Sequence, residues 1–192
     1  MRSTNEKGIA LILTMLLITV ISIMGISLMF LSQSETWSSL NYRYASQARD
    51  AAESAVNSAA NYLMYSYTPA GTVSDPFSGY NMSASPVQSP SSSSSGADVL
   101  LSANTAISSN YPVSAVQTAF NTNGVGKGTL TVGNTTVNYS SYARLLNMQS
   151  ITPYLTSSPV TIQTWQITAN ATISGVRSAT EQVTAILEKP IV

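Results

Sequence analysis

The sequence predicts an α+β protein in which a long N-terminal helix packs on an antiparallel β-sheet. Three observations support this fold class. No proline occurs between Met1 and Thr68, so no proline interrupts a helix there. The run Ile9–Leu31 carries no charge. Towards the C-terminus, apolar and polar residues alternate on both sides of Gly175, which is typical of two paired strands.

The predicted helix has two halves, and the first, Ile9–Leu31, is apolar on every side. A helix of this length extends about 34 Å at ~1.5 Å per residue. That is enough to cross a bilayer hydrocarbon core of about 30 Å. Because a helix that is apolar all round needs an apolar environment, we predict that lipid or other helices surround residues 9–31.

Two simpler interpretations of the apolar run remain open. A cleaved secretory signal has an apolar region of about 7–15 residues and ends in a small-x-small site. This run is longer, and the segment Ser32-Gln33-Ser34-Glu35 that follows it contains no such site. A plain N-terminal membrane anchor also fits the run.

The second half of the predicted helix, residues 32–68, is amphipathic. Its apolar residues recur every three or four positions, as on one face of a helix. This stripe consists of Trp37, Leu40, Tyr44, Ala48, Ala51, Ala52, Ala55, Ala59, Tyr62 and Leu63. Because small residues allow close approach of a neighbour, we predict that Ala48–Leu63 packs on the globular part of the chain. The helix is expected to end at Thr68-Pro69-Ala70-Gly71.

Residues 69–97 are predicted to form a loop, and residues 98–192 a β-rich head. The loop is rich in proline and serine and includes the five serines 91–95. At the start of the head, Asp98–Ser108 predicts a short helix, whereas Val113–Phe120 is ambiguous.

Several segments of the head have the alternating pattern of strands. Residues 128–139 predict a hairpin around Gly133-Asn134, and residues 142–148 a strand or turn. The strongest signals are 160–174 and 179–187, which predict a long C-terminal hairpin.

Composition excludes several classes of site. The chain has no histidine and no cysteine, so it has no zinc finger, no thiolate cluster and no Ser-His-Asp triad. Eight basic and eight acidic residues give a net charge of zero, which argues against nucleic acid as a partner. Asp75 and Asp98 flank the serine-rich loop, but they lack the spacing of an acidic calcium loop. We predict that the chain is not an enzyme and holds no cofactor or metal.

Three features of the N-terminal part point to a family. Glu6-Lys7-Gly8 directly precedes the apolar run, and the run opens with Gly8–Leu17. A third feature, QARDAAESA, occupies residues 47–55 and includes Gln47, Ala51, Ala52 and Glu53. Together they resemble the type IV pilin superfamily, and more narrowly the PilX-type minor pilins and the related K pseudopilins of type II secretion. The resemblance covers residues 5–63 and implies the lollipop-like pilin fold, a helix packed on a sheet.

The resemblance also implies roles for individual residues. Residues 1–8 would be a leader peptide, which prepilin peptidase removes by cleaving between Gly8 and Ile9, and Ile9 would then be N-methylated. The fifth mature position, where major pilins carry a glutamate that neutralises a neighbouring amino terminus, is Leu13 here. This difference favours a low-copy minor subunit over a major pilin. Packing in the membrane and the filament would involve Ile9, Leu11, Leu16, Leu17, Ile23 and Leu31.

We therefore expect a minor pilin that primes or caps a type IV pilus or pseudopilus at its tip. The implied partners are other minor pilins, the major pilin, prepilin peptidase and a tip adhesin. The implied location is the bacterial inner membrane for the precursor, and then the pilus or pseudopilus, from periplasm to cell surface. The alternative is a membrane-tethered periplasmic or extracellular binding module that never enters a filament.

Overall fold

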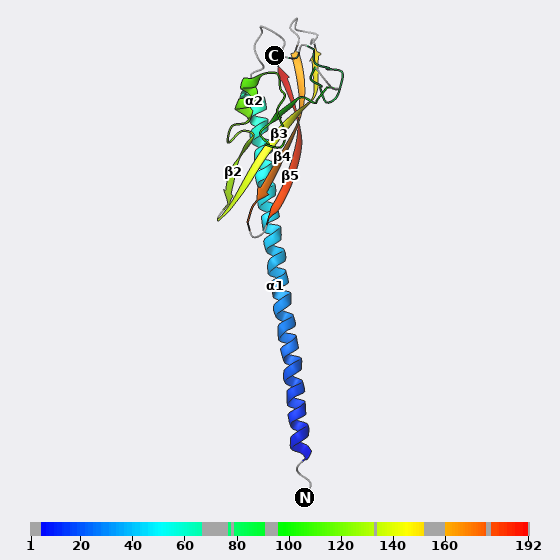
Figure 1. The fold of residues 1–192 in the computed structure, drawn as a ribbon, viewed down its shortest axis with the longest axis vertical. Helices are drawn as coiled ribbons and strands as arrows, with labels where there is room; N and C mark the ends of the chain where they lie inside the picture. The colour runs from blue at the N-terminus through cyan, green and yellow to red at the C-terminus, as the bar shows by residue number, and fades with distance from the viewer. Residues whose placement is uncertain are drawn as a thin grey trace. The chain divides into compact units, whose positions relative to one another are not determined.

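The computed structural model describes residues 5–66, 77, 79–90, 96–132, 134–151, 160–175 and 178–191. The chain divides into two compact units, residues 1–43 and residues 44–192. Helix α1, Asn5–Asn61, contributes residues to both and is followed by the π-helical turn η1, Tyr62–Ser66 (Figure 1). The predicted helix over residues 9–68 is thus confirmed as far as Ser66, and its proposed stop at residues 68–71 lies outside the described residues.

The second unit contains a five-stranded antiparallel sheet. Strands β3, β4 and β5 form its long central part, and β1 and β2 both pair with the edge of β3 that β4 leaves free. The elements are β1 Leu100–Ser102, α2 Ser114–Phe120, β2 Lys127–Val132, β3 Thr135–Ile151, β4 Val160–Ile173 and β5 Ala179–Ile191. The predicted α+β class, a long helix packed on an antiparallel sheet, is confirmed.

Both predicted hairpins form, and their registers follow the predicted turns. In the first, Val132 lies opposite Thr135. In the second, Ile173 lies opposite Ala179. Residues 142–148, predicted as a strand or turn, belong to β3, which is much longer than its local pattern indicated.

The short helix predicted for Asp98–Ser108 is wrong. Leu100–Ser102 forms β1 and pairs with Tyr142–Arg144 of β3, and no helix occurs among residues 98–108. A short apolar run has the same local pattern in a buried helix and in a buried strand. The partner strand, which is distant in sequence, decides the outcome. The ambiguous segment Val113–Phe120 is mostly helical, as α2.

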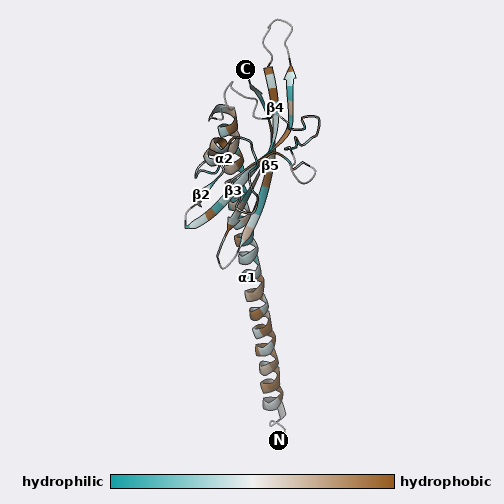
Figure 2. Ribbon diagram, turned by 45° about the horizontal axis from the view of Figure 1, so that its top comes forward, coloured by the Kyte–Doolittle hydropathy of each residue, from teal (hydrophilic) through white to brown (hydrophobic). Residues whose placement is uncertain are grey.

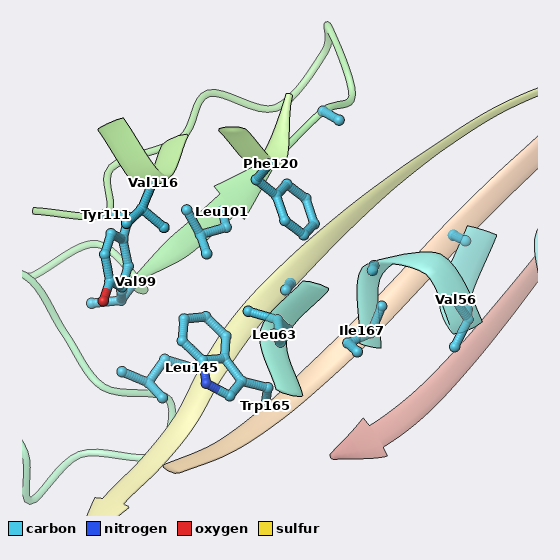
Figure 3. Close-up of a cluster of buried hydrophobic side chains, with 14 of the residues drawn as sticks. Val56, Leu63, Val99, Leu101, Tyr111, Val116, Phe120, Leu145, Trp165 and Ile167 are labelled. Atoms are coloured by element: carbon cyan, nitrogen blue, oxygen red, sulfur yellow. The ribbon is translucent and has the colours of Figure 1, made fainter. Parts of the chain in front are cut away.

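The alanine-rich stripe of α1 packs on one face of the sheet. Ala48, Ala51 and Ala52 lie in one cluster with Val137 and Ile173. Farther along the chain, the helical stripe enters a larger cluster around Trp165 (Figure 3). The members of that larger cluster include Ala55, Val56, Ala59, Leu63, Leu101, Tyr111, Phe120, Leu145 and Ile167. The predicted packing of Ala48–Leu63 on the chain's own globular part is therefore confirmed.

Candidate functional site

The N-terminal unit presents an apolar helix with no protein around it. Every residue from Gly8 to Ser39 is exposed, and Figure 2 shows brown, hydrophobic residues along this part of α1. The most apolar window has a mean hydropathy of 2.7 and is not buried at all. Among the described residues, this is the one helix long and apolar enough to cross a membrane. Lipid or other helices have to cover such a surface in water-rich surroundings.

The residues predicted to pack in a membrane or filament lie on this helix and are all well exposed. They are Ile9, Leu11, Leu16, Leu17, Ile23 and Leu31, with exposed fractions from 57% to 66%. At about 100° per residue, Leu11 lies on the opposite side of the helix from Ile9. The other four residues of the predicted set lie within about 80° of Ile9, so five of the six share one face of the helix.

Three of the four hydroxyl side chains of the apolar run form hydrogen bonds within the helix. The hydroxyls of Thr14, Thr19 and Ser27 donate to backbone carbonyls one turn earlier, at 2.8–2.9 Å. These bonds remove the main cost of placing a hydroxyl in an apolar environment.

Gly8, Ile9 and Leu13 are accessible. A Cβ at Gly8 would meet nothing within 4 Å, and the side chains of Ile9 and Leu13 are 66% and 68% exposed. No aspartate or glutamate occurs between Gly8 and Leu31. The helix surface around Leu13 therefore has no carboxylate of its own that could neutralise a cation.

The family-like stretch of residues 47–55 lies in the second unit and has two faces. Ala51 and Ala52 are fully buried against the sheet. Glu53 faces outward and accepts a hydrogen bond from Arg49 Nε at 2.9 Å. This hydrogen bond, together with the negative charge of Glu53, raises the pKa of Arg49.

Gln47 is buried, a property that sequence reasoning did not predict. Its side chain is only 6% exposed, and within the described part of the chain its Oε1 has no hydrogen-bond partner. In the sequence, Gln47 directly precedes Ala48 of the apolar stripe and so lies at the edge of the apolar face. This position was the one indication in the sequence that Gln47 is buried.

Lys189 is a second residue that sequence reasoning missed. Its Nζ donates to the backbone carbonyl of Leu63 at 2.6 Å, in the π-helical turn that follows α1. Burial lowers the pKa of Lys189. Carbonyls at the end of a helix lack partners in the helix, and a lysine is a suitable donor. The position of Lys189 near the end of the last strand gives no indication of which helix end it contacts.

Of the two acidic residues that flank the serine-rich loop, the structure describes Asp98 only. Asp98 lies 3.3 Å from Arg144 Nε, and Asp75 is outside the described residues. Among the residues that the structure describes, no group of three or more His, Cys, Asp or Glu side chains could hold a metal ion.

Comparison with known proteins gave one match. Residues 7–57 match the family model described as PilX N-terminal. The matched range includes Gly8 and Ile9, the whole apolar helix, and the stretch from Gln47 to Glu53. No curated protein and no solved structure matches the chain.

Proposed function

We propose that this chain, a PilX-type minor pilin of the type IV pilin superfamily, primes or caps a type IV pilus or a pseudopilus at its tip. The observation that carries the proposal is the exposed apolar helix of residues 9–31 in a chain of this family. Members of the family are structural components of pili.

The apolar helix suits both of the environments that assembly requires. In the inner membrane, lipid covers residues 9–31; in the filament, the helices of neighbouring subunits cover them. Both environments are dry, so transfer from one to the other does not expose the apolar surface to water. The hydroxyls bonded within the helix need no partner in either place.

Leu13 supports a position at the filament tip. Inside a filament, the amino terminus of one subunit is a buried cation, and an unpaired buried charge is costly. In major pilins a glutamate at the fifth mature position neutralises it. A subunit with leucine there cannot neutralise the amino terminus of its neighbour. We therefore infer that this chain is a low-copy subunit at an end of the filament.

Processing after Gly8 is the first step to test. The proposal predicts that the protein recovered from cells begins at an N-methylated Ile9. Gly8→Leu should block cleavage, whereas Gly25→Leu should not. Both glycines are in the exposed helix, and a Cβ at either would meet nothing within 4 Å. Mass spectrometry of the N-terminal peptide measures the outcome.

Each result has a clear meaning. An intact Met1 would reject processing and favour the alternative, a membrane-tethered binding module. A terminus beyond Leu31 would indicate a secretory signal and would reject both proposals.

Location and partners need a separate experiment. We propose that the precursor lies in the inner membrane and that the mature chain enters the pilus. There it would contact other minor pilins, the major pilin and a tip adhesin. Immunogold labelling should place it at filament ends. Replacing residues 9–31 with an unrelated apolar helix should keep it in the membrane but remove it from filaments. A tethered module would function equally well with the replacement.

A further inference from the structure

A hollow in the second unit, whose lining is about equally polar and apolar, has no role in the proposed assembly function. It has a volume of about 550 Å³ and lies where β2 begins. We refer to it as the β2 hollow. Its polar lining consists mainly of Thr105, Asn123, Lys127, Asn138, Tyr139 and Ser140. Among the described residues of the lining, Lys127 is the one that carries a charge.

The polar side chains of the β2 hollow are available for a ligand. Among the described residues, Thr105, Asn123, Lys127, Asn138 and Ser140 make no side-chain hydrogen bond or ion pair. A neighbouring hollow of about 370 Å³ has a more polar lining, but several of its groups already form hydrogen bonds within the protein. There Ser109 bonds the backbone of Ser102, and Gln117 bonds the carbonyl of Tyr111.

The wall of the β2 hollow is held in place. Gly124 adopts a φ of 83°, which suits glycine, and its N–H donates to the carbonyl of Lys127 at 2.8 Å. The hydroxyl of Ser58, on α1, donates to the carbonyl of Gly124. The site is therefore largely preformed, which reduces the entropy cost of binding.

Gly128 allows Tyr139 to lie close against β2. A Cβ at Gly128 would be 2.5 Å from the hydroxyl oxygen of Tyr139, which is closer than real atoms come. The two residues are directly opposite each other in the β2–β3 pair. The absence of a side chain at residue 128 thus leaves room for the Tyr139 ring beside the hollow.

The glycine-rich turn beside the hollow is not a phosphate-binding loop. Its amides already donate within the protein: Gly124 to Lys127, Val125 to Thr122, and Gly126 to Phe120. A phosphate loop needs free N–H groups that point at the ligand. The described lining offers an anionic ligand one cation, Lys127, so one carboxylate of the ligand would pair there while neutral polar groups make the other contacts.

The neutral polar chemistry continues from the hollow across the sheet. Lys127, Ser140, Asn170 and Gln182 lie opposite one another on β2, β3, β4 and β5, which run side by side (Figure 1). Gln182 Nε2 donates to Asn170 Oδ1 at 2.8 Å. Four strands at roughly 4.8 Å spacing make this row about 14 Å long. Its length and chemistry suit a short chain of sugars.

We propose that the β2 hollow and this polar row bind an acidic oligosaccharide. The sugar carboxylate would pair with Lys127, and the sugar hydroxyls would bond Asn138, Ser140 and the amides beyond them. The amides of Asn123 and Asn138 and the hydroxyl of Ser140, which make no side-chain bond among the described residues, match a ligand that both donates and accepts at many positions. A nucleic acid would need several cations, and Lys127 supplies one. The proposal goes beyond the assembly function and does not depend on it.

The test uses the full-length chain in micelles of a detergent without a sugar headgroup. Calorimetric titration compares trigalacturonate with its neutral methyl ester, which keeps the ring hydroxyls. We expect the acid to bind more tightly than the ester. Lys127→Gln should weaken binding of the acid about tenfold, the size of one charge-assisted hydrogen bond. Arg43→Gln, which removes one positive charge from the exposed surface of α1, is the matched control and should leave the affinity unchanged.

Two further measurements keep the test decisive if the Lys127 variant folds poorly. Asn138→Ala, which removes an exposed amide, should weaken the binding of the acid and of the ester by the same factor. Amide chemical shifts of the unmodified chain should change around Lys127 and Ser140 when trigalacturonate is added. The proposal would be overturned if trigalacturonate does not bind, if shifts appear elsewhere only, or if Lys127→Gln binds as well as the wild type. It would also be overturned if acetate competes as well as the trisaccharide, since charge alone would then explain binding.

Discussion

At the scale of single residues, Lys189 links the end of the helical segment to the last strand. Lys189→Met keeps the aliphatic length but removes the donor to the Leu63 carbonyl. We expect the free energy of unfolding of the head to fall by about 1–3 kcal/mol, the cost of a buried acceptor left without a bond. The buried Trp165 reports this unfolding by fluorescence in a Trp37→Phe background.

The neighbouring residue provides the control for this prediction. Glu188 is exposed on the same strand, so Glu188→Gln should change the unfolding free energy very little. Equal losses in the two variants would mean that the bond to Leu63 does not stabilise the head.

The raised pKa values of two partly buried tyrosines predict how the stability of the head changes at alkaline pH. Burial raises the pKa of Tyr62 and of Tyr80 above their ordinary value of 10.0. Above that pH the unfolded chain has lost these protons while the folded chain keeps them, so stability falls as pH rises. Burial of Lys189 lowers its pKa below 10.5 and has the opposite sign: stability rises with pH between its folded and unfolded values.

The variant Tyr80→Phe separates the contribution of a tyrosine to this pH dependence from the contribution of Lys189. We expect this variant to lose less stability than the wild type between about pH 10 and 12. Denaturant unfolding at a series of pH values measures the difference. Tyr65→Phe is the control, because the Tyr65 side chain is 83% exposed. An unchanged alkaline slope in Tyr80→Phe would show that the burial of this tyrosine does not matter for stability.

At the scale of elements, the seam between α1 and the sheet depends on small side chains. Ala52 is fully buried in the cluster that contains Val137 and Ala171. Ala52→Leu adds volume where the backbones are close, and we expect a loss of about 1–3 kcal/mol in unfolding free energy. Thermal unfolding followed by circular dichroism measures it. Ser54→Leu adds the same side chain on the exposed face and should have little effect; a gain in stability from Ala52→Leu would mean that the seam has unfilled space.

Local periodicity predicted the elements that continue over many residues. The alanine stripe of α1 and the alternation in β4 and β5 are each visible within one segment. In contrast, β1 has only three residues, and it is a strand because Leu100 pairs with Arg144, far away in sequence. The β2 hollow was not predictable for the same reason, since it joins Thr105, Lys127 and Asn138 from three separate segments.

The residues proposed to act in assembly were not predicted from periodicity. Gly8, Ile9, Leu13 and the stretch from Gln47 to Glu53 were identified by resemblance, because each belongs to a short segment of continuous sequence. What the motif could not give is the environment of each side chain. Ala52 is buried and Glu53 is exposed because the sheet covers only one face of the helix. The buried Oε1 of Gln47 and the bond from Lys189 to Leu63 depend on that same packing.

At the scale of the whole molecule, the two units differ in whether their apolar side chains are buried or exposed. The second unit buries its large apolar side chains, including Trp165 and Phe120. The first unit leaves apolar side chains such as Leu17 and Phe30 exposed along the helix. Intramolecular packing accounts for the second unit alone. The surface of the first unit has to be covered by lipid or by other chains.

These two possible environments for the first unit respond differently to mutation. Leu17→Arg places a charge in the middle of the apolar run, where a bilayer penalises it by about 2.5–3.5 kcal/mol. We expect membrane integration of the precursor to fall, while Ser39→Arg, outside the run, should integrate normally. Partition between membrane and soluble fractions measures this result.

A second substitution at the same position keeps the hydrophobicity and changes only the shape. Leu17→Phe should integrate as well as the wild type, because lipid tolerates any apolar side chain. Close packing between helices does not tolerate added volume, so in a filament the same change should reduce incorporation. Quantifying the subunit in sheared filaments and in membranes from the same cells compares the two environments directly. If Leu17→Phe leaves both amounts unchanged, then the helix is only an anchor, and the proposed packing of residue 17 in a filament is wrong.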